Sequence, residues 1–300
     1  MAIATHMIFN DASEQETALP SWQQRYIQIS TGQYRGRNDY LAVPGITITR
    51  ERINAVVAQE VYAPSDLVVF SFTVDPQSSW RVDGRSFLGH QCFLARGGHE
   101  RAQCCIQGCD VVMVSIKADL LSWDTQAMPL LQTLSVSGLH HYREWLIGLL
   151  EANSGVGMFT QDEMLHLLPR IVIDQLSNLY HQSHSRKTLN GARSSSIFRS
   201  ASRLALDSDA GPFSFAEIAQ GIGVDIDVAH NAVREILGIT ASQWLVCQRL
   251  NGARRDLLRA RSSGATVASV AVKWHFWHLG RFAASYRQMF GEVPSDTIRQ

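Results

Sequence analysis

The chain has 300 residues, of which 45% are hydrophobic and 18% are charged, and its 27 basic side chains equal its 27 acidic ones. This composition is that of a globular protein long enough for two domains, and no apolar run reaches the roughly 18 residues that a membrane helix needs. The first 18 residues lack a basic start followed by an apolar core, so we expect no signal peptide and a cytoplasmic protein.

The charge is unevenly distributed along the chain. Residues 195–300 hold 12 Lys or Arg and 9 Asp or Glu, whereas residues 1–194 hold 15 and 18. A basic C-terminal part beside an acidic N-terminal part is consistent with nucleic-acid binding at one end.

The first part of the chain is predicted to be rich in strands. Short alternating or β-branched runs are separated by turn signals such as Pro44-Gly45 and Asp83-Gly84. The predicted strands cover residues 25–30, 34–43, 46–53, 67–74, 86–95, 102–107 and 111–116. Short strands at this spacing indicate a small barrel or sandwich.

Two amphipathic helices are predicted next, over residues 138–151 and 161–181, and Pro169 should kink or divide the second one. The polar stretch 181–196 reads as a linker. The predicted domains are therefore 1–180 and 197–300, joined by residues 181–196.

The C-terminal part repeats itself. The residues at 229, 233, 237, 238, 242 and 245 have counterparts of the same kind fifty-three positions later, and Ile218-Ala219 matches Val270-Ala271. Each copy has a short helix, a turn, and a second helix ending at Gly238 or Gly291, where a left-handed cap is expected. This order predicts two helix-turn-helix units joined by a long helix over 242–261. The alternative is a six- or seven-helix domain with a chance internal match.

Residues 276–299 resemble the signature of the AraC/XylS family of transcriptional regulators. The matching residues are Phe282, Tyr286, Phe290-Gly291, Pro294-Ser295 and Arg299, and residues 213–258 are similar to that family's first unit and connecting helix. One departure is His275, where the family usually has glycine in the turn of the second unit. We expect a strained backbone or an altered turn there.

The resemblance implies that two recognition helices enter successive major-groove segments on one face of double-stranded DNA. In the first unit it assigns base contacts to His230 and Asn231 and a phosphate contact to Arg234. Asp227 either accepts a hydrogen bond from cytosine or caps the helix, and we favour the cap.

In the second unit Arg281 is the candidate for reading guanine, because its fork matches the O6/N7 pair. His278, Ser285 and Arg287 suit phosphate or sugar contacts.

A solvated helix face is the alternative for every basic residue on these helices. We favour it for Arg254, Arg255 and Arg259, and we assign Trp244 and Trp277 to the core.

For the N-terminal part the resemblance implies a cupin-like β-barrel followed by dimerisation helices and a response to a small molecule. The expected fold is thus α+β, with an all-α C-terminal domain. The helices 138–151 and 161–181 form the dimer interface, close the barrel's open end, or do both.

An enzyme is the alternative from another class. The sequence has no His-x-His pair, and His90 and His99 stand nine residues apart, so we predict no catalytic residues, no metal and no cofactor. Cys104, Cys105 and Cys109 suit thiol sensing, although clustered strand cysteines are more often small buried hydrophobes.

The hairpin around Pro44-Gly45 gathers arginines on one face. With a two-residue turn at Pro44-Gly45, the numbers of residues paired across the hairpin add up to 89. Because side chains alternate along a strand, one face then carries Arg35, Arg37, Asp39, Arg50, Arg52 and Asn54. Opposed arginines repel unless an anion lies between them, which suggests an anionic, phosphate- or nucleotide-like effector held by Arg35, Arg37, Arg50 and Arg52. The alternative, which we favour, is a solvated face or pairing with carboxylates elsewhere.

The sequence is therefore interpreted as a DNA-binding transcriptional regulator, more an activator than a repressor, controlled by a small-molecule effector. It is expected to form a homodimer, with RNA polymerase as a further candidate partner. The runner-up is an effector-independent regulator whose barrel only dimerises, and a cupin-type enzyme comes third.

Overall fold

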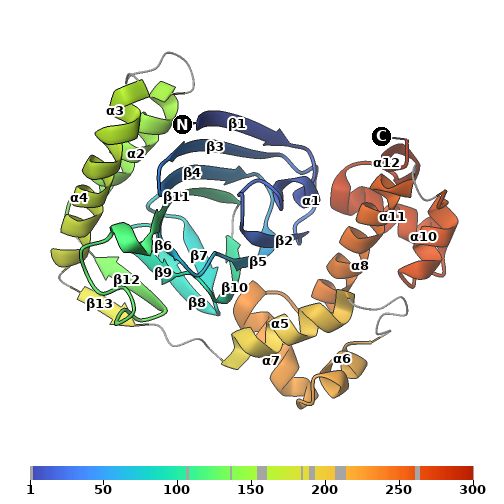
Figure 1. Ribbon diagram of the computed structural model, residues 1–300. Coiled ribbons are helices and arrows are strands. Elements are labelled where there is room, and N and C mark those ends of the chain that lie inside the picture. Colours follow the sequence, from blue (N-terminus) through green and yellow to red (C-terminus); the bar gives the residue numbers. More distant parts are fainter. Residues whose placement is uncertain are drawn as a thin grey trace.

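The computed structural model describes residues 3–105, 108–135, 137–153, 161–183, 185–188, 193–206, 214–260 and 264–299. The fold is α+β, with strands in the N-terminal part and helices in the C-terminal part (Figure 1). The strands are β1 Ile3–Phe9, β2 Gln23–Gln28, β3 Gly36–Val43, β4 Ile46–Ile53, β5 Val57–Tyr62, β6 Leu67–Thr73, β7 Ser79–Val82, β8 Arg85–Leu88, β9 Cys92–Arg96, β10 Glu100–Cys105, β11 Cys109–Lys117, β12 Leu131–Ser135 and β13 Ser185–Thr188. Short helices α1 (Ala12–Gln15) and η1 (Ala118–Leu120) lie between them.

The described strands form two separate sheets with a shared core, so of the expected barrel or sandwich the structure shows a sandwich, and the expected cupin-like barrel is not closed. One has eight strands in the order β1-β3-β4-β11-β6-β9-β12-β13, and the other has five in the order β2-β5-β10-β7-β8. The predicted hairpin register is confirmed, because Arg37 pairs with Arg52 and Asp39 with Arg50.

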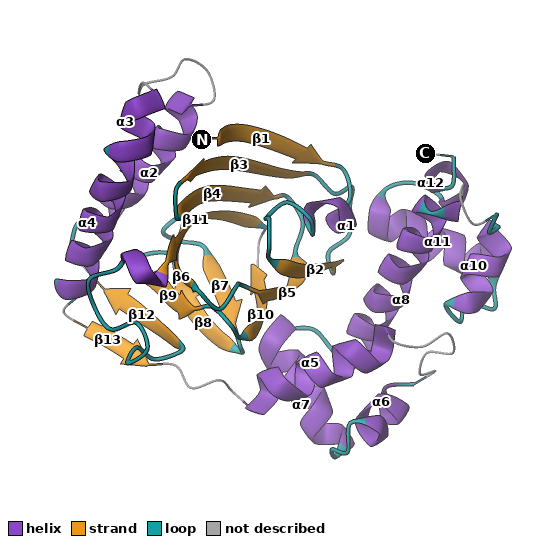
Figure 2. Ribbon diagram, in the orientation of Figure 1, coloured by secondary structure: helices purple, strands orange, loops and turns teal. Residues whose placement is uncertain are grey.

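Side-chain alternation gives each sheet two different faces. One face of the eight-stranded sheet packs, through residues such as Ile48 and Val114, on the helices that follow the strands. Its other face, with Ile53 and Met113, shares a core with Trp80 of the five-stranded sheet. The far side of the five-stranded sheet belongs to the core of the C-terminal helices, so the sheets lie between two groups of helices (Figure 2).

The helices α2 (Leu139–Asn153) and α4 (Leu168–His181) cover the eight-stranded sheet, and α3 (Gln161–His166) contacts α4. The predicted second helix is divided at Leu167, and Pro169 stands in the first turn of α4, where its missing N–H costs nothing. The predicted linker contains β13 and the start of the next helix, whereas residues 184 and 189–192 lie outside the described residues.

Five strands were not predicted: β1, β5, β7, β12 and β13. Strand β5 was not predicted because Gln59 and Glu60 interrupt its apolar pattern, although Gln59 is buried. The single strand predicted over 86–95 is two strands, because a turn at residues 89–91 separates β8 from β9.

The C-terminal helices follow the predicted repeat to the residue. They are α5 Arg193–Leu206, α6 Phe215–Gly221, α7 Ile226–Leu237, α8 Ala241–Leu258, α10 Val267–Lys273, α11 Leu279–Phe290 and α12 Pro294–Thr297. An offset of fifty-two superposes the bounds of α6 on those of α10, and an offset of fifty-three superposes α7 on α11. No helix of the described residues combines the length and apolarity needed to cross a membrane.

Hydrogen bonds join the two halves of the molecule beside β2. The Asn251 side chain accepts from the Gln28 backbone N–H at 3.1 Å and donates to the Gln28 carbonyl at 2.9 Å. The Gly32 N–H donates to the Met289 carbonyl at 3.0 Å. These contacts hold α8 and the end of α11 against the strands (Figure 1).

Candidate nucleic-acid interface

Helix α7 begins and ends at identifiable residues. The Asp225 side chain accepts from the Asp227 N–H, so Asp225 is the N-cap and Asp227 is not the cap that the sequence suggested. The helix ends at Gly238, whose φ of 76° is the left-handed conformation predicted from the repeat. Asp227 lies in the first turn, where its negative charge interacts favourably with the positive end of the helix dipole.

One face of α7 is buried and the other is free. Ala229, Val233 and Leu237 are buried in the C-terminal core. Asn231 and Arg234 are exposed, while His230 is half-buried and its ring stacks on Phe215 at 4.8 Å. The structure therefore places Asn231 and Arg234 outward and leaves only part of His230 for a partner.

Helix α11 repeats this division. Phe282, Tyr286 and Phe290 are buried, and Gly291 caps the helix with a φ of 77°. The residues carried over as DNA contacts lie on the outer side: His278, Arg281 and Arg287 are exposed, and Ser285 is half-buried.

Helix α8 connects the two units. It begins with a capping box in which Thr240 and Gln243 exchange hydrogen bonds, and Trp244 is fully buried as predicted. Its 18 residues span roughly 27 Å at 1.5 Å per residue. Both units pack against this helix, which holds the two recognition helices in a fixed relation.

Known proteins match this same part of the chain. A family model described as a helix-turn-helix domain matches residues 218–300. A probable thc operon regulatory protein of Rhodococcus erythropolis is 38% identical over 88 residues, which are 29% of this chain and 26% of that protein. The XylDLEGF operon transcriptional activator of Pseudomonas putida is 35% identical over 71 residues, 24% of this chain and 22% of the relative. Residues 218–300 therefore contain a helix-turn-helix domain of the AraC/XylS type.

The matches span about a quarter of the length of these curated AraC/XylS relatives. Among solved structures, the AraC-like transcriptional activator CuxR aligns over 90% of this chain and 100% of its own, with a TM-score of 0.47 and 14% identity. A probable AraC family regulator from Rhodopseudomonas palustris aligns over 35% of this chain and 96% of its own, with a TM-score of 0.31 and 27% identity.

The departure from the AraC/XylS pattern at His275 has a structural counterpart. His275 has a φ of 65°, close to the 70° of Gly223 at the equivalent position of the first unit. The turn thus keeps the shape that glycine allows, and a histidine adopts it at a conformational cost. The expected backbone strain is confirmed.

Trp277 is not a core residue, which corrects the sequence prediction. Its side chain is 64% exposed and lies just before α11, beside the exposed His278. An apolar ring at the start of a recognition helix can contact sugars or thymine methyl groups. Sequence reasoning missed it because tryptophan is buried in most contexts.

Arg254 and Arg255 are also placed differently from the prediction of a solvated face. Arg254 is buried and forms ion pairs with Asp11 and with Glu292, the latter at 2.7 Å. Arg255 pairs with Glu16. Both therefore join the DNA-binding half to the N-terminal half. Arg259 is exposed.

The arginine hairpin has carboxylate partners within the fold. Asp39 lies between the opposed Arg37 and Arg52 and pairs with both. Arg50 pairs with Asp110 at 2.8 Å and with Glu151 at 3.3 Å. Arg35 is exposed and precedes β3. These carboxylates remove the repulsion that suggested an anionic effector, and binding of an anion there stays a prediction.

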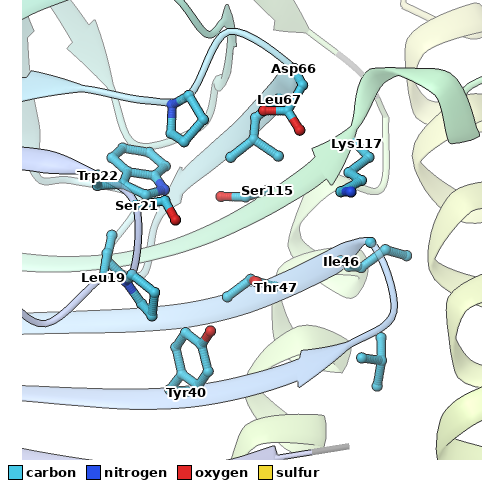
Figure 3. A pocket seen from close by; sticks show the side chains of 14 residues that line it. Leu19, Ser21, Trp22, Tyr40, Ile46, Thr47, Asp66, Leu67, Ser115 and Lys117 are labelled. Atoms are coloured by element: carbon cyan, nitrogen blue, oxygen red, sulfur yellow. The ribbon is translucent and has the colours of Figure 1, made fainter. Parts of the chain in front are cut away.

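A surface pocket of about 330 Å³ opens at the end of the eight-stranded sheet. Figure 3 shows Tyr40, Thr47 and Ser115, from three neighbouring strands, together with Trp22 and Lys117. In the described part of the chain no three His, Cys, Asp or Glu side chains converge to hold a metal.

The cysteine cluster is buried. Burial raises the pKa of Cys104 to about 12. A hydrogen bond with Cys105 and burial raise the pKa of Cys109 well above its usual range. A raised pKa disfavours the thiolate of Cys104 and Cys109, and burial shields both thiols, which argues against thiol sensing by these two residues.

Proposed function

We propose that this protein is a transcriptional regulator that binds double-stranded DNA through α7 and α11. The observation that carries the proposal is the pair of congruent recognition helices, each buried on one side and bearing exposed polar and basic residues on the other, held on one connecting helix. Arg281 and Asn231 read bases, whereas Arg234, His278, Ser285 and Arg287 contact the backbone.

The regulator acts as an activator under the control of a small-molecule effector. The relatives named as activators of the XylDLEGF operon support activation. The N-terminal part, residues 1–180, is the sensing and dimerisation domain, with two facing sheets that resemble an open cupin barrel, and residues 181–196 join it to the DNA-binding domain 197–300. The working form is a homodimer whose two DNA-binding domains meet paired half-sites.

The test is a fluorescence-anisotropy titration with DNA from upstream of the protein's own coding sequence, at several salt concentrations. We expect tight binding that weakens steeply with salt, because neutralised phosphates release counterions. Arg281→Ala should abolish discrimination at one base pair, while Lys117→Ala, which removes an exposed basic side chain from the end of β11, should bind as the wild type does. Salt-insensitive binding, or equal effects of both variants, would refute the proposal.

A further inference from the structure

The two sheets of the N-terminal part have four edges among the described strands. Strands β1 and β13 end the eight-stranded sheet, and β2 and β8 end the five-stranded sheet. An edge strand presents backbone N–H and C=O groups without partners, so another strand can pair with it. Proteins protect such edges with short strands, charged side chains or covering elements. Three of these four edges are protected in one of these ways.

The edge of β2 is closed by side chains of α8 and of the residue that follows α1. The Asn251 side chain bonds both backbone groups of Gln28, at 3.1 Å and 2.9 Å. The Tyr26 N–H donates to the Glu16 carboxylate at 2.7 Å, and the Tyr26 carbonyl accepts from Arg255 at 2.8 Å. Strand β2 therefore has no free groups for another strand at Tyr26 and Gln28.

The edges of β13 and β8 are protected by their length and their charge. Each strand has four residues. Strand β13 contains Arg186 and Lys187, and β8 begins with Arg85. Two copies of either strand would bring like charges together, which opposes pairing of the strand with itself.

The edge of β1 has none of these protections. Strand β1 has seven residues and contains no proline and no Lys, Arg, Asp or Glu. Within the part of the chain that the structure describes, no strand pairs with its outer side and no side chain hydrogen-bonds to its backbone. Figure 1 shows β1 at one end of its sheet, beside β3. Strand β1 is therefore a long, uncharged edge that is open to another strand.

The side chains along this edge include an exposed apolar one. Ile8 is 68% exposed, and Thr5 and His6 are also exposed. The cross-strand neighbour of Ile8 is Arg37, whose charge is paired with Asp39 at 2.9 Å. A partner strand at this edge would thus remove the apolar surface of Ile8 from water without meeting an unpaired charge from Arg37.

We propose that β1 is a dimer interface and that its partner is β1 of a second copy of this chain. The proposal rests on the homodimer named under the proposed function, and it assigns the surface that forms this dimer. A two-fold axis requires the same surface on both subunits, and an edge strand without like charges meets this requirement. A different protein would need charges or pockets on β1 to recognise, and the strand offers no Lys, Arg, Asp or Glu.

The pairing joins the eight-stranded sheets of the two subunits into one continuous sheet. Antiparallel pairing over all seven residues places His6 on the two-fold axis, and it places Ile8 opposite Ala4 of the partner subunit. Such a pair forms roughly one hydrogen bond between the chains for each paired residue. The backbone therefore supplies most of the polar contacts, and Ile8 supplies apolar contact beside them.

Sedimentation velocity of the full chain without DNA, over a range of protein concentrations, tests the proposal. We expect a dimer that forms as the concentration rises. Ile8→Lys should weaken dimerisation at least about 10-fold, because each dimer would carry two lysines beside the paired strands. Leu130→Lys replaces a 43% exposed leucine just before β12 and should dimerise as the wild type does. Leu167→Lys, between α3 and α4, should also leave the dimer intact.

Cross-linking is a second measurement that does not depend on added charge. In His6→Cys, the new cysteines of the two subunits face each other across the axis, so mild oxidation should link the chains. The five native cysteines are buried, which keeps the background low. Gln175→Cys, on the exposed side of α4, should not be linked.

Three outcomes would overturn the proposal: a wild type that stays monomeric, an Ile8→Lys variant that dimerises as the wild type does, or His6→Cys chains that stay unlinked. Loss of the dimer in Leu167→Lys alone, or linking of Gln175→Cys alone, would move the interface to the helices. Anisotropy with DNA that carries a single half-site is measured in parallel. Tight DNA binding with any of these outcomes refutes the interface alone, whereas a β1 dimer that binds no DNA refutes the proposed function.

Discussion

Arg254 and Asp11 stand 243 positions apart in the sequence and form a buried ion pair. Asp11 caps α1 at the edge of the N-terminal strands, and Arg254 lies in α8 of the DNA-binding domain. Arg254 also pairs with Glu292, just after α11. One guanidinium therefore connects the N-terminal half, the connecting helix α8 and the end of α11.

Arg254→Ala is expected to destabilise the protein by about 3–5 kcal/mol, because it leaves Asp11 buried without its partner. The free energy of unfolding from urea titration measures this loss. Arg234→Ala removes an exposed arginine from α7 and should change it by less than about 0.5 kcal/mol. Equal losses in the two variants would show that the ion pair contributes nothing to stability.

The left-handed turns of the two units give a matched pair of substitutions. Gly223→Ala should cost about 1 kcal/mol from conformation alone, because no atom lies within 4 Å of the added Cβ. His275→Gly should stabilise the protein by up to about 1 kcal/mol, since it relieves the same conformation. Thermal unfolding checks both signs, and destabilisation by His275→Gly would show that contacts of the histidine outweigh the strain.

Substitutions of base-contacting and of phosphate-contacting residues should have different effects on DNA binding. Asn231→Ala should cost about 1–3 kcal/mol on the preferred operator and relax specificity at one base pair. Arg287→Ala should weaken binding to every sequence and reduce the salt slope by about one. Anisotropy titrations on the operator and on scrambled DNA distinguish the two patterns, and identical behaviour of both variants would contradict the assigned roles.

Trp277→Ala is expected to lower DNA affinity several-fold with little change in thermal stability, because the ring is 64% exposed. A stability loss as large as that of Trp244→Ala, which empties a fully buried position, would mean that Trp277 is structural instead.

Glu51 makes stability depend on pH. Burial raises its pKa above 4.5, although hydrogen bonds from Tyr26, Gln59 and Gln15 partly oppose the shift. The folded state therefore binds the proton of the Glu51 carboxyl group more tightly than the unfolded state does. This contribution to the free energy of unfolding is complete below about pH 4.5 and is lost as the pH rises through the raised pKa.

In urea unfolding between pH 4.5 and 7.5, the stability of the wild type relative to Glu51→Gln should fall by about 1.4 kcal/mol per unit of pKa shift. Other titrating groups are common to both proteins and cancel in this comparison. A difference that stays constant with pH would show that Glu51 is ionised throughout.

The sequence predicted what local pattern determines. The repeat located α6, α7, α10 and α11, and apolar alternation located strands such as β4. It failed where distant segments decide the environment: Arg254 appeared solvated because its partner Asp11 is far away in the chain. Strand β5 was not predicted because its polar residue Gln59 is buried. Gln59 is hydrogen-bonded to Glu51 and Gln103, and no local sequence pattern reveals these partners.

Helix α8 also fixes the rotation of one helix-turn-helix unit relative to the other about the α8 axis. One inserted residue would turn α11 by about 100° around the α8 axis relative to α7, and would lengthen the gap by only 1.5 Å. Under the proposed function, the two DNA segments that α7 and α11 contact are therefore constrained in relative rotation more strictly than in spacing. Substitutions can change the exposed residues of α7 or of α11 independently, but insertions or deletions in α8 preserve the relative rotation only when they come close to whole helical turns.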